Sequence, residues 1–273
     1  SAGVGQLAGQ SCQALRMSDL ASRATSLLEL HQAPEILVLA NVWDVASARV
    51  VAATDGVRAL ATASHSIAAS FGYEDGENIP LELHLDMVRR IVEAVDLPVT
   101  MDFEAGYGDP GETARKVMQA GAVGGNLEDQ LKPLDDAVRA VEQVLAAGAK
   151  EGIDFVLNAR TDAFRAGSER TAMLDDAIRR GQAFLAAGAP VVFVPGAIER
   201  DEITALVDAF GPQRLSLISA PGRSLSTKEL QDLGVARVST GPFTQRVALT
   251  ALQDATAELV NGGVLPATTR ALN

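Results

Sequence analysis

The chain has 273 residues, of which 47% are hydrophobic and only 4% aromatic, and its formal net charge is −12. This charge argues against nucleic acid and against an anionic membrane surface as partners, and no apolar run approaches the ~20 residues of a membrane-spanning helix. One cysteine, Cys12, excludes a disulfide framework and a cysteine-based zinc site, and is typical of the reducing cytoplasm. Residues 1–17 lack the basic segment and apolar run of a secretory signal, and we interpret them as an N-terminal extension.

After this extension, the sequence predicts a helix over 20–30 and then eight β–α units. Eight short apolar runs rich in branched residues predict the strands: Ile36–Ala40, Val57–Ala63, Val99–Phe103, Ala122–Leu127, Phe155–Ala159, Val191–Val194, Leu215–Ser219 and Ala236–Thr240. A segment with helical periodicity follows each run, most clearly at Ile79–Ala94 and Thr171–Ala187. At this length, near-continuous apolar strands alternating with helices predict an α/β fold, a single (β/α)₈ barrel domain over 18–273.

The alternative fold is an open, doubly wound sheet. Neither the G-x-G-x-x-G fingerprint of dinucleotide-binding sheets nor a P-loop occurs in the chain, so we favour the barrel. In such barrels the active-site residues lie at the carboxyl ends of the strands. The residues at those ends are therefore the first candidates for a functional site.

Acidic residues follow the third and fourth predicted strands: Asp102 and Glu104 after Leu97–Met101, and Glu128 after Ala122–Leu127. Because side chains alternate along a strand, we expect Asp102 and Glu104 to face the same way. Carboxylates that converge beside a glycine-rich turn suit a hard cation, Mg²⁺ or alternatively Mn²⁺. The competing interpretation is that these acids only cap the following helices.

The fifth predicted strand ends with Asn158 and Arg160, which also alternate onto one face. We expect both to bind substrate, since a planar guanidinium fits a carboxylate or phosphoryl oxygen; a plain buried ion pair is the alternative for Arg160.

Trp43 is expected to be a wall of the site or part of the core. His65 and Tyr107 lie near the site in sequence, where a loop or packing role is the simpler interpretation. None of the four lysines ends a strand, which argues against a Schiff-base aldolase.

Six strings in chain order resemble the isocitrate lyase/phosphoenolpyruvate mutase superfamily. They are Trp43-Asp44-x-x-Ser47-Ala48-Arg49, Ala68-Ala-Ser-x-Gly72-Tyr-x-Asp75, Asp102-x-Glu104-x-Gly-Tyr-Gly, Asn126-Leu-Glu128-Asp129, Asn158-Ala-Arg160-Thr-Asp162 and Gly234-Val-Ala-Arg-Val-Ser239. Each string alone is a weak signal, but the ordered set is specific and covers most of the chain.

The resemblance implies a Mg²⁺-dependent barrel that acts on small 2-oxo or 2-hydroxy acids. It implies three residues that hold the metal, partly through water: Asp102, Glu104 and Glu128. It also implies that the backbone around Ala63 and Ser64 binds the substrate carboxylate, that Arg160 contacts the substrate, and that Asp75 lies over the metal. Members of the superfamily exchange their eighth helix, here Phe243–Val260, and assemble as homo-oligomers, dimers of dimers.

The chain departs from the superfamily at the loop after Glu128. The lyases carry Lys-x-Cys-Gly-His there and the mutase carries Lys-Thr-Asn-Ser, whereas this chain has Gln130-Leu-Lys132-Pro, without Cys or His. Ala63 stands where the family has serine, Glu104 where many members have Asp, and Pro195 where many have Glu. The catalytic acid of the usual isocitrate and methylisocitrate lyases is therefore absent, and the lid is short.

We therefore expect an enzyme that breaks a C–C or C–P bond in a small 2-oxo or 2-hydroxy acid through a metal-stabilised enolate, with Asp75, Glu128 and Arg160 as catalytic residues. An oxaloacetate-type decarboxylase or lyase fits best, because decarboxylation needs an electron sink and no protein nucleophile. The alternatives are a 2-methylisocitrate or dimethylmalate lyase and a phosphonopyruvate-type hydrolase or mutase. A non-catalytic oxo-acid-binding barrel is the alternative of another class, although a binder needs fewer polar groups than this chain retains.

Overall fold

The computed structural model describes residues 18–167 and 169–272; the expected extension 1–17, with Cys12, lies outside them. Nine strands, all paired in parallel, form one sheet in the order β1-β9-β8-β7-β6-β5-β4-β3-β2. The first predicted strand, Ile36–Ala40, contains β1 (Leu37–Leu39), and the chain continues after Ala40 as a short second strand, β2 (Asn41–Val42), which lies beyond the predicted run. β1 pairs with β9 and β2 pairs with β3, so the ring closes through this strand. The predicted (β/α)₈ barrel is thereby confirmed.

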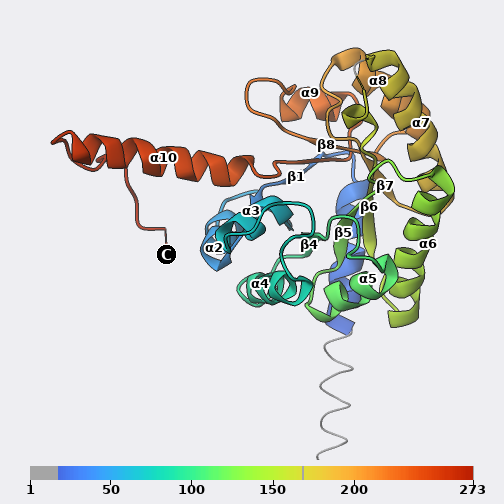
Figure 1. Cartoon of the computed structure of the whole chain (residues 1–273), viewed down its shortest axis with the longest axis horizontal. Coiled ribbons are helices and arrows are strands. Elements are labelled where there is room, and N and C mark those ends of the chain that lie inside the picture. The colour runs from blue at the N-terminus through green and yellow to red at the C-terminus, as the bar shows by residue number, and fades with distance from the viewer. Residues whose placement is uncertain (1–17, 168, 273) are drawn as a thin grey trace, which may run out of the picture.

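The remaining strands follow the other seven predicted runs. They are β3 (Leu60–Thr62), β4 (Val99–Asp102), β5 (Gly124–Glu128), β6 (Val156–Arg160), β7 (Val191–Phe193), β8 (Leu215–Ile218) and β9 (Arg237–Ser239). The helices between and after them are α2 (Val45–Ala52), α3 (Ser64–Ser70), α4 (Leu81–Glu93), α5 (Pro110–Gln119), α6 (Leu134–Glu151), η1 (Ala163–Arg165), α7 (Arg170–Ala186), α8 (Arg200–Phe210), α9 (Thr227–Asp232) and α10 (Phe243–Val260). In Figure 1 the helices α4 to α9 surround the strands on three sides.

Helix α4 illustrates how the sequence produces this layer. Leu85, Val88 and Ile91 recur at helical spacing and are buried, whereas Arg90 between them is exposed. Such a stripe packs against the outer face of the strands and leaves the charged face in water. Full burial of each branched side chain contributes roughly 1.5–3 kcal/mol, which outweighs the weak intrinsic preference of a short helix.

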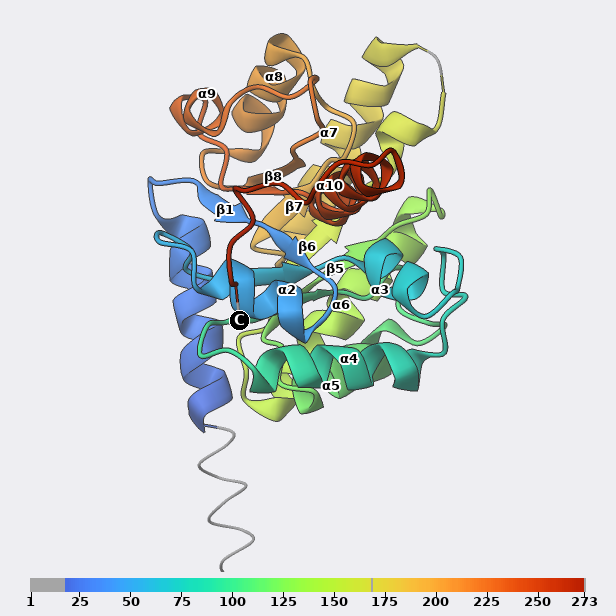
Figure 2. The same cartoon turned by 90° about the vertical axis from the view of Figure 1, so that its left-hand side faces the viewer.

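The helix through residues 18–32 covers the amino end of the barrel. Its apolar residues Leu20, Ala24 and Leu27 are buried, and a Cβ placed on Gly124, the first residue of β5, would lie 2.9 Å from Leu27 Cδ2. Figure 2 shows this helix, in blue, at the left-hand end of the strands. Since this end is covered, the carboxyl ends of the strands are left for a functional site.

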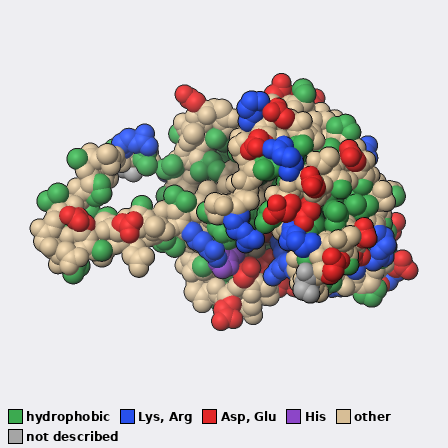
Figure 3. All heavy atoms as spheres, turned by 90° about the horizontal axis from the view of Figure 1, so that it is seen from above, with side chains coloured by type: hydrophobic (Ala, Val, Ile, Leu, Met, Phe, Trp, Pro, Cys, Tyr) green, Lys and Arg blue, Asp and Glu red, His purple; other side chains and the backbone are tan. Residues whose placement is uncertain are grey.

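Helix α10 has the bounds predicted for the eighth helix, but it projects away from the barrel (Figure 1). Five of its large apolar residues are exposed: Val247, Leu249, Leu252, Leu259 and Val260. Hydrophobic side chains also mark the segment that extends to the left in Figure 3. Among the helices of residues 18–167 and 169–272, none has the length and apolar character needed to cross a membrane.

Candidate active site

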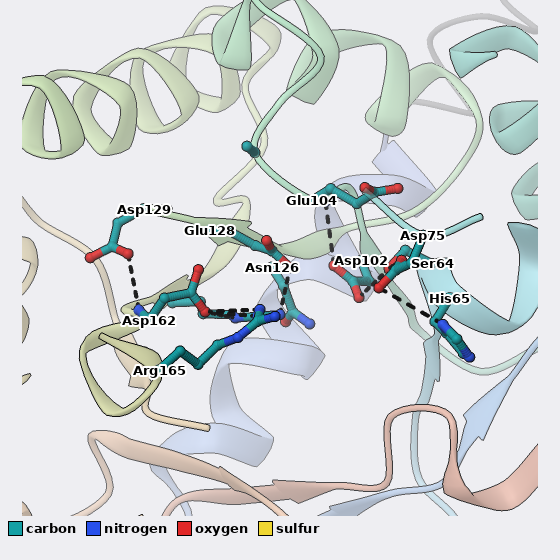
Figure 4. A network of polar contacts seen from close by, with 12 residues as sticks. Ser64, His65, Asp75, Asp102, Glu104, Asn126, Glu128, Asp129, Asp162 and Arg165 are labelled. Atoms are coloured by element: carbon teal, nitrogen blue, oxygen red, sulfur yellow. Dashed lines mark hydrogen bonds and ion pairs between the residues drawn. The ribbon is translucent and has the colours of Figure 1, made fainter. Parts of the chain in front are cut away.

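Asp102, the last residue of β4, lies in a group of polar side chains at the carboxyl end of the barrel. Ser64, the first residue of α3, donates a 2.9 Å hydrogen bond from Oγ to Asp102 Oδ2, and the same Oγ lies 3.4 Å from Asp75 Oδ1. His65 Nδ1 lies 3.8 Å from Asp75 Oδ2. Figure 4 shows these four side chains together on one side of the site. The segments at 64 and 102, which were predicted separately, are thus in direct contact.

Glu104 reaches the same region by a turn and not by strand alternation. β4 ends at Asp102, and the φ of Glu104 is 56°, in the left-handed region. The alternation that we expected to align Asp102 with Glu104 is therefore wrong. The Glu104 carboxylate instead accepts hydrogen bonds from the backbone N–H of Glu77 and from Tyr107 Oη, the latter at 3.1 Å. The two acids remain neighbours, because the Glu104 N–H donates to Asp102 Oδ1 at 3.3 Å.

Glu128 and Arg160 are register partners at the ends of β5 and β6. Arg160 Nη1 donates to Glu128 Oε1 at 2.5 Å, while Nε and Nη2 donate to Asp162 Oδ1 at 2.9 and 2.7 Å. A guanidinium carries five N–H groups. Three are used within the part of the chain that the structure describes, which leaves one on each terminal nitrogen for an anionic ligand. The ion pair proposed as the alternative for Arg160 is present, and it does not exhaust the donors of the side chain.

Burial disfavours ionisation of the three predicted metal ligands. It raises the pKa of Glu104 to about 7, and the neighbouring charge of Asp102 adds to the effect. Burial also raises the pKa of Asp102 and of Glu128, against the opposing influence of Arg160. Ionised carboxylates in such a place are stabilised by an opposite charge close by. The cluster is therefore suited to a bound cation.

The donor chemistry also fits Mg²⁺, since all the donors are hard carboxylate oxygens. In the part of the chain that the structure describes, however, no three His, Cys, Asp or Glu side chains converge as a ready ligand set. Glu104 is turned toward Glu77 and Tyr107, and Glu128 is held by Arg160. Mg²⁺ usually keeps several waters and takes one or two carboxylates directly. The residues fit the ion if water completes the ligand set.

The other predicted site residues lie at different depths. Asn158 is fully buried below the open face, and its Nδ2 donates to Asn126 Oδ1 at 2.8 Å. Ala63 is buried in extended backbone just before α3. Trp43 is partly buried and packs against the main core, which agrees with the second of its two predicted roles. Asp75 is about half exposed, with 53% of its side chain accessible.

Sequence reasoning missed three residues that shape this region. Arg237 on β9 is fully buried and donates from Nη2 to Asn126 Oδ1 at 3.2 Å, while its Nε and Nη1 have no hydrogen-bond partner among the described residues. Burial lowers the pKa of Arg237 to about 10. Glu77 Oε1 accepts a 2.7 Å hydrogen bond from the backbone N–H of Tyr107. The third residue is Asp129, which belongs to one of the family-like strings but was given no role.

Comparison with known proteins agrees with this geometry. The sequence matches the family described as phosphoenolpyruvate phosphomutase over residues 27–260. The chain belongs to this family. It is 32% identical to an uncharacterised protein of Mycobacterium tuberculosis (strain ATCC 25618 / H37Rv), over 88% of this chain and 91% of that protein. It is 29% identical to the oxaloacetate decarboxylase of Paraburkholderia xenovorans (strain LB400), over 88% of this chain and 82% of that enzyme.

A solved structure extends the comparison to the fold. The crystal structure of a phosphonomutase candidate from Burkholderia cenocepacia J2315 superposes with a TM-score of 0.79 and is 38% identical, covering 89% of this chain and 100% of that one. The resemblance inferred from the motifs is therefore confirmed. The protein is an enzyme of the phosphoenolpyruvate mutase/isocitrate lyase superfamily.

Proposed function

We propose that this enzyme is a Mg²⁺-dependent decarboxylase of an oxaloacetate-type 2-oxo acid, with Mn²⁺ as the alternative ion. The observation that carries the proposal is the setting of Arg160. Its guanidinium is held by Glu128 and Asp162 and leaves two N–H groups without a partner among the described residues, and its charge also acts on Asp102, whose pKa it lowers against the effect of burial. An anion anchor next to a cation site is what a small chelating oxo-acid requires.

The loop after β5 supports decarboxylation over the other reactions of the superfamily. Residues 130–133 contain no Cys, His or acidic side chain that could act as a general acid. Loss of carbon dioxide from a 2-oxo acid breaks a C–C bond without protonation of a leaving group, and water can supply the proton that the product carbon needs afterwards. The similarity to an oxaloacetate decarboxylase, at 29% identity, points in the same direction.

The residues of the site have distinct roles in this proposal. Arg160 binds and orients the substrate carboxylate, with its guanidinium plane held by Asp162. Asp102, Glu104 and Glu128 would hold the cation, partly through water, and Ser64 orients Asp102 through its hydrogen bond. When bound, the cation supplies Lewis-acid polarisation of the 2-oxo group. Asp75 lies beside Ser64 and is about half exposed.

A panel of acids with Mg²⁺ or Mn²⁺, followed by NMR of the products, tests the proposal. The panel contains oxaloacetate, phosphonopyruvate, 2-methylisocitrate and 2,3-dimethylmalate. Because metal ions alone decarboxylate oxaloacetate slowly, reactions without protein and with an Asp102→Ala variant set the background. We expect pyruvate from oxaloacetate well above both backgrounds. Turnover of another panel member would select one of the alternative reactions, and tight oxalate binding without any turnover would select a non-catalytic binder.

We further propose that the protein is a homo-oligomer, a dimer of dimers, in the cytoplasm. The exposed apolar residues of α10 support an exchange of this helix between two copies, since such a surface is costly to leave in water. Sedimentation of the wild type is expected to give a tetramer, and Leu252→Glu is expected to lower the mass of the assembly. A wild-type monomer at micromolar concentration would contradict the exchange.

A further inference from the structure

Asp129, the residue after Glu128, joins three parts of the molecule. Its side chain is 1% exposed. Oδ1 accepts hydrogen bonds from the backbone N–H of Leu131 at 3.0 Å and of Asp162 at 2.9 Å. Oδ2 accepts a 3.1 Å hydrogen bond from Arg180 Nη1 on α7. A buried carboxylate with three donors of this kind fixes the positions of all of them.

The contact between Asp129 and Asp162 leads directly to the substrate-anchoring arginine. Asp162 Oδ1 accepts from both Nε and Nη2 of Arg160. The backbone N–H of Asp129 also donates to the Arg160 carbonyl oxygen at 3.0 Å. Figure 4 shows the hydrogen bond between Asp129 and Asp162, and next to it the two hydrogen bonds that the Asp162 carboxylate accepts from Arg160. Asp129 thus holds the end of β6 at two points and sets where the guanidinium plane lies.

The same carboxylate holds the loop of residues 129–133, which follows β5. Gln130 and Leu131 both have left-handed backbone, with φ of 48° and 55°, a conformation that is unfavourable for side chains other than glycine. The Leu131 N–H bond to Asp129 stabilises this conformation, and Arg180 Nη1 donates to the Lys132 carbonyl oxygen at 3.0 Å. The loop is therefore tied both to its own start and to helix α7.

We propose that Asp129 is a positioning residue. It fixes the Arg160 guanidinium for anion binding, and with Arg180 it holds the loop after β5 in one conformation beside the open end of the barrel. The first part of this inference rests on the proposed function, because it takes Arg160 as the anion anchor. The second part concerns the conformation of the loop alone and does not depend on the reaction.

Calorimetric titration with oxalate at saturating Mg²⁺ tests the first part in a double-mutant cycle. Asp129→Ala is expected to weaken oxalate binding on the order of tenfold, which corresponds to the loss of one charge-assisted hydrogen bond between Arg160 and the anion. Asp129→Asn is expected to weaken it less, since the amide oxygen still accepts from the N–H groups of Leu131 and Asp162. In an Arg160→Lys background, Asp129→Ala should have little further effect. Additive losses, or unchanged affinity in Asp129→Ala, would overturn a role exerted through Arg160.

Hydrogen–deuterium exchange of the peptide covering 129–133 tests the second part. We expect faster exchange in Asp129→Ala and in Arg180→Met. Arg179→Met is the matched control, because Arg179 lies next in sequence on α7, is 57% exposed and pairs only with Asp176 among the described residues. Unchanged exchange in Asp129→Ala, or equal acceleration in the control, would overturn the proposal that Asp129 and Arg180 hold this loop in one conformation.

The two readouts separate the possible failures. If the wild type binds no oxalate, the proposed function and the first part fail, while loop exchange still decides the second part. If Asp129→Ala does not fold, Asp129→Asn carries the oxalate titration and Arg180→Met carries the exchange measurement, since each removes one side of the ion pair. Wild-type oxalate affinity in Asp129→Asn together with wild-type exchange in Arg180→Met would overturn the whole proposal.

Discussion

Arg160 and Glu128 form an ion pair across β6 and β5, with 2.5 Å between Nη1 and Oε1 and with only 13% and 16% of their side chains exposed. A buried pair of this kind is favourable only if its remaining hydrogen-bonding groups are satisfied. Asp162 satisfies two further N–H groups of Arg160. The guanidinium is therefore oriented before a ligand arrives, which lowers the entropic cost of binding an anion.

Replacing this guanidinium should affect the anion more than the metal. Arg160→Lys keeps the charge but removes the planar pair of donors, so oxalate affinity at saturating Mg²⁺ should fall about tenfold to a hundredfold. Mg²⁺ affinity without oxalate should change less than threefold, by calorimetry. Arg165→Lys is the matched control, because Arg165 is 64% exposed and lies 3.6 Å from Asp162. An equal loss in the control would contradict the anchoring role.

Removing the charge of Asp102 should separate metal binding from folding. Asp102→Asn keeps the shape and an acceptor for the Ser64 hydroxyl, but it removes a carboxylate whose pKa burial raises. We expect the metal-free protein at pH 8 to be unchanged or more stable, by on the order of 1 kcal/mol in urea unfolding. The rise in Tm on adding Mg²⁺ should disappear. Asp135→Asn, at an exposed position of α6, should keep that rise.

The core around β5 should not tolerate a side chain at Gly125. A Cβ there would lie 2.5 Å from Phe103 Cε1 and 2.7 Å from the Met101 carbonyl oxygen, and the backbone oxygen cannot move aside. Gly125→Ala is expected to lower the free energy of unfolding by about 1–3 kcal/mol. Gly167→Ala is the control, since a Cβ placed on Gly167 would meet no heavy atom of the described residues within 4 Å, its chain neighbours aside. Similar denaturation midpoints for both variants would disprove the packing argument.

Buried His31 should make the protein less stable in mild acid. Its Nδ1 donates to the Leu27 carbonyl oxygen at 2.8 Å, and burial lowers the pKa of His31 from 6.5 to about 3. Because the unfolded chain binds this proton below pH 6.5 and the folded protein does not, stability falls as the pH drops through that window. From pH 7 to 5 the contribution lost is about 2 kcal/mol.

Other groups titrate over the same range with the opposite sign, since the raised pKa of Glu104 favours the folded state as the pH falls. The test is therefore a difference between two proteins. His31→Gln removes the titrating imidazole and leaves the carboxylates in place. The free energy of unfolding of the variant, relative to that of the wild type, should therefore rise by about 2 kcal/mol from pH 7 to 5. Parallel pH profiles in urea unfolding would show that His31 does not contribute.

Local pattern was sufficient for the elements and for part of the site. Short apolar runs marked every strand of the barrel except the two-residue β2, and alternation correctly put Asn158 and Arg160 on one face of β6. The placement of Asp102 and Glu128 at strand ends followed from the same pattern. In a parallel barrel all carboxyl ends meet at one face, so residues at those ends come together without any knowledge of detailed contacts.

Contacts between residues far apart in the sequence depend on the closure of the barrel and could not be predicted from local pattern. Glu104 turns away from the strand direction because its backbone is left-handed, and the alternation of side chains in the sequence does not predict such a turn. Ser64 meets Asp102 across 38 positions, and Arg180 meets Asp129 across 51. Sequence periodicity encodes which face a residue occupies within its own element. Which polar atoms meet depends on strand register and on how each helix packs against the barrel, and these exist only in the folded chain.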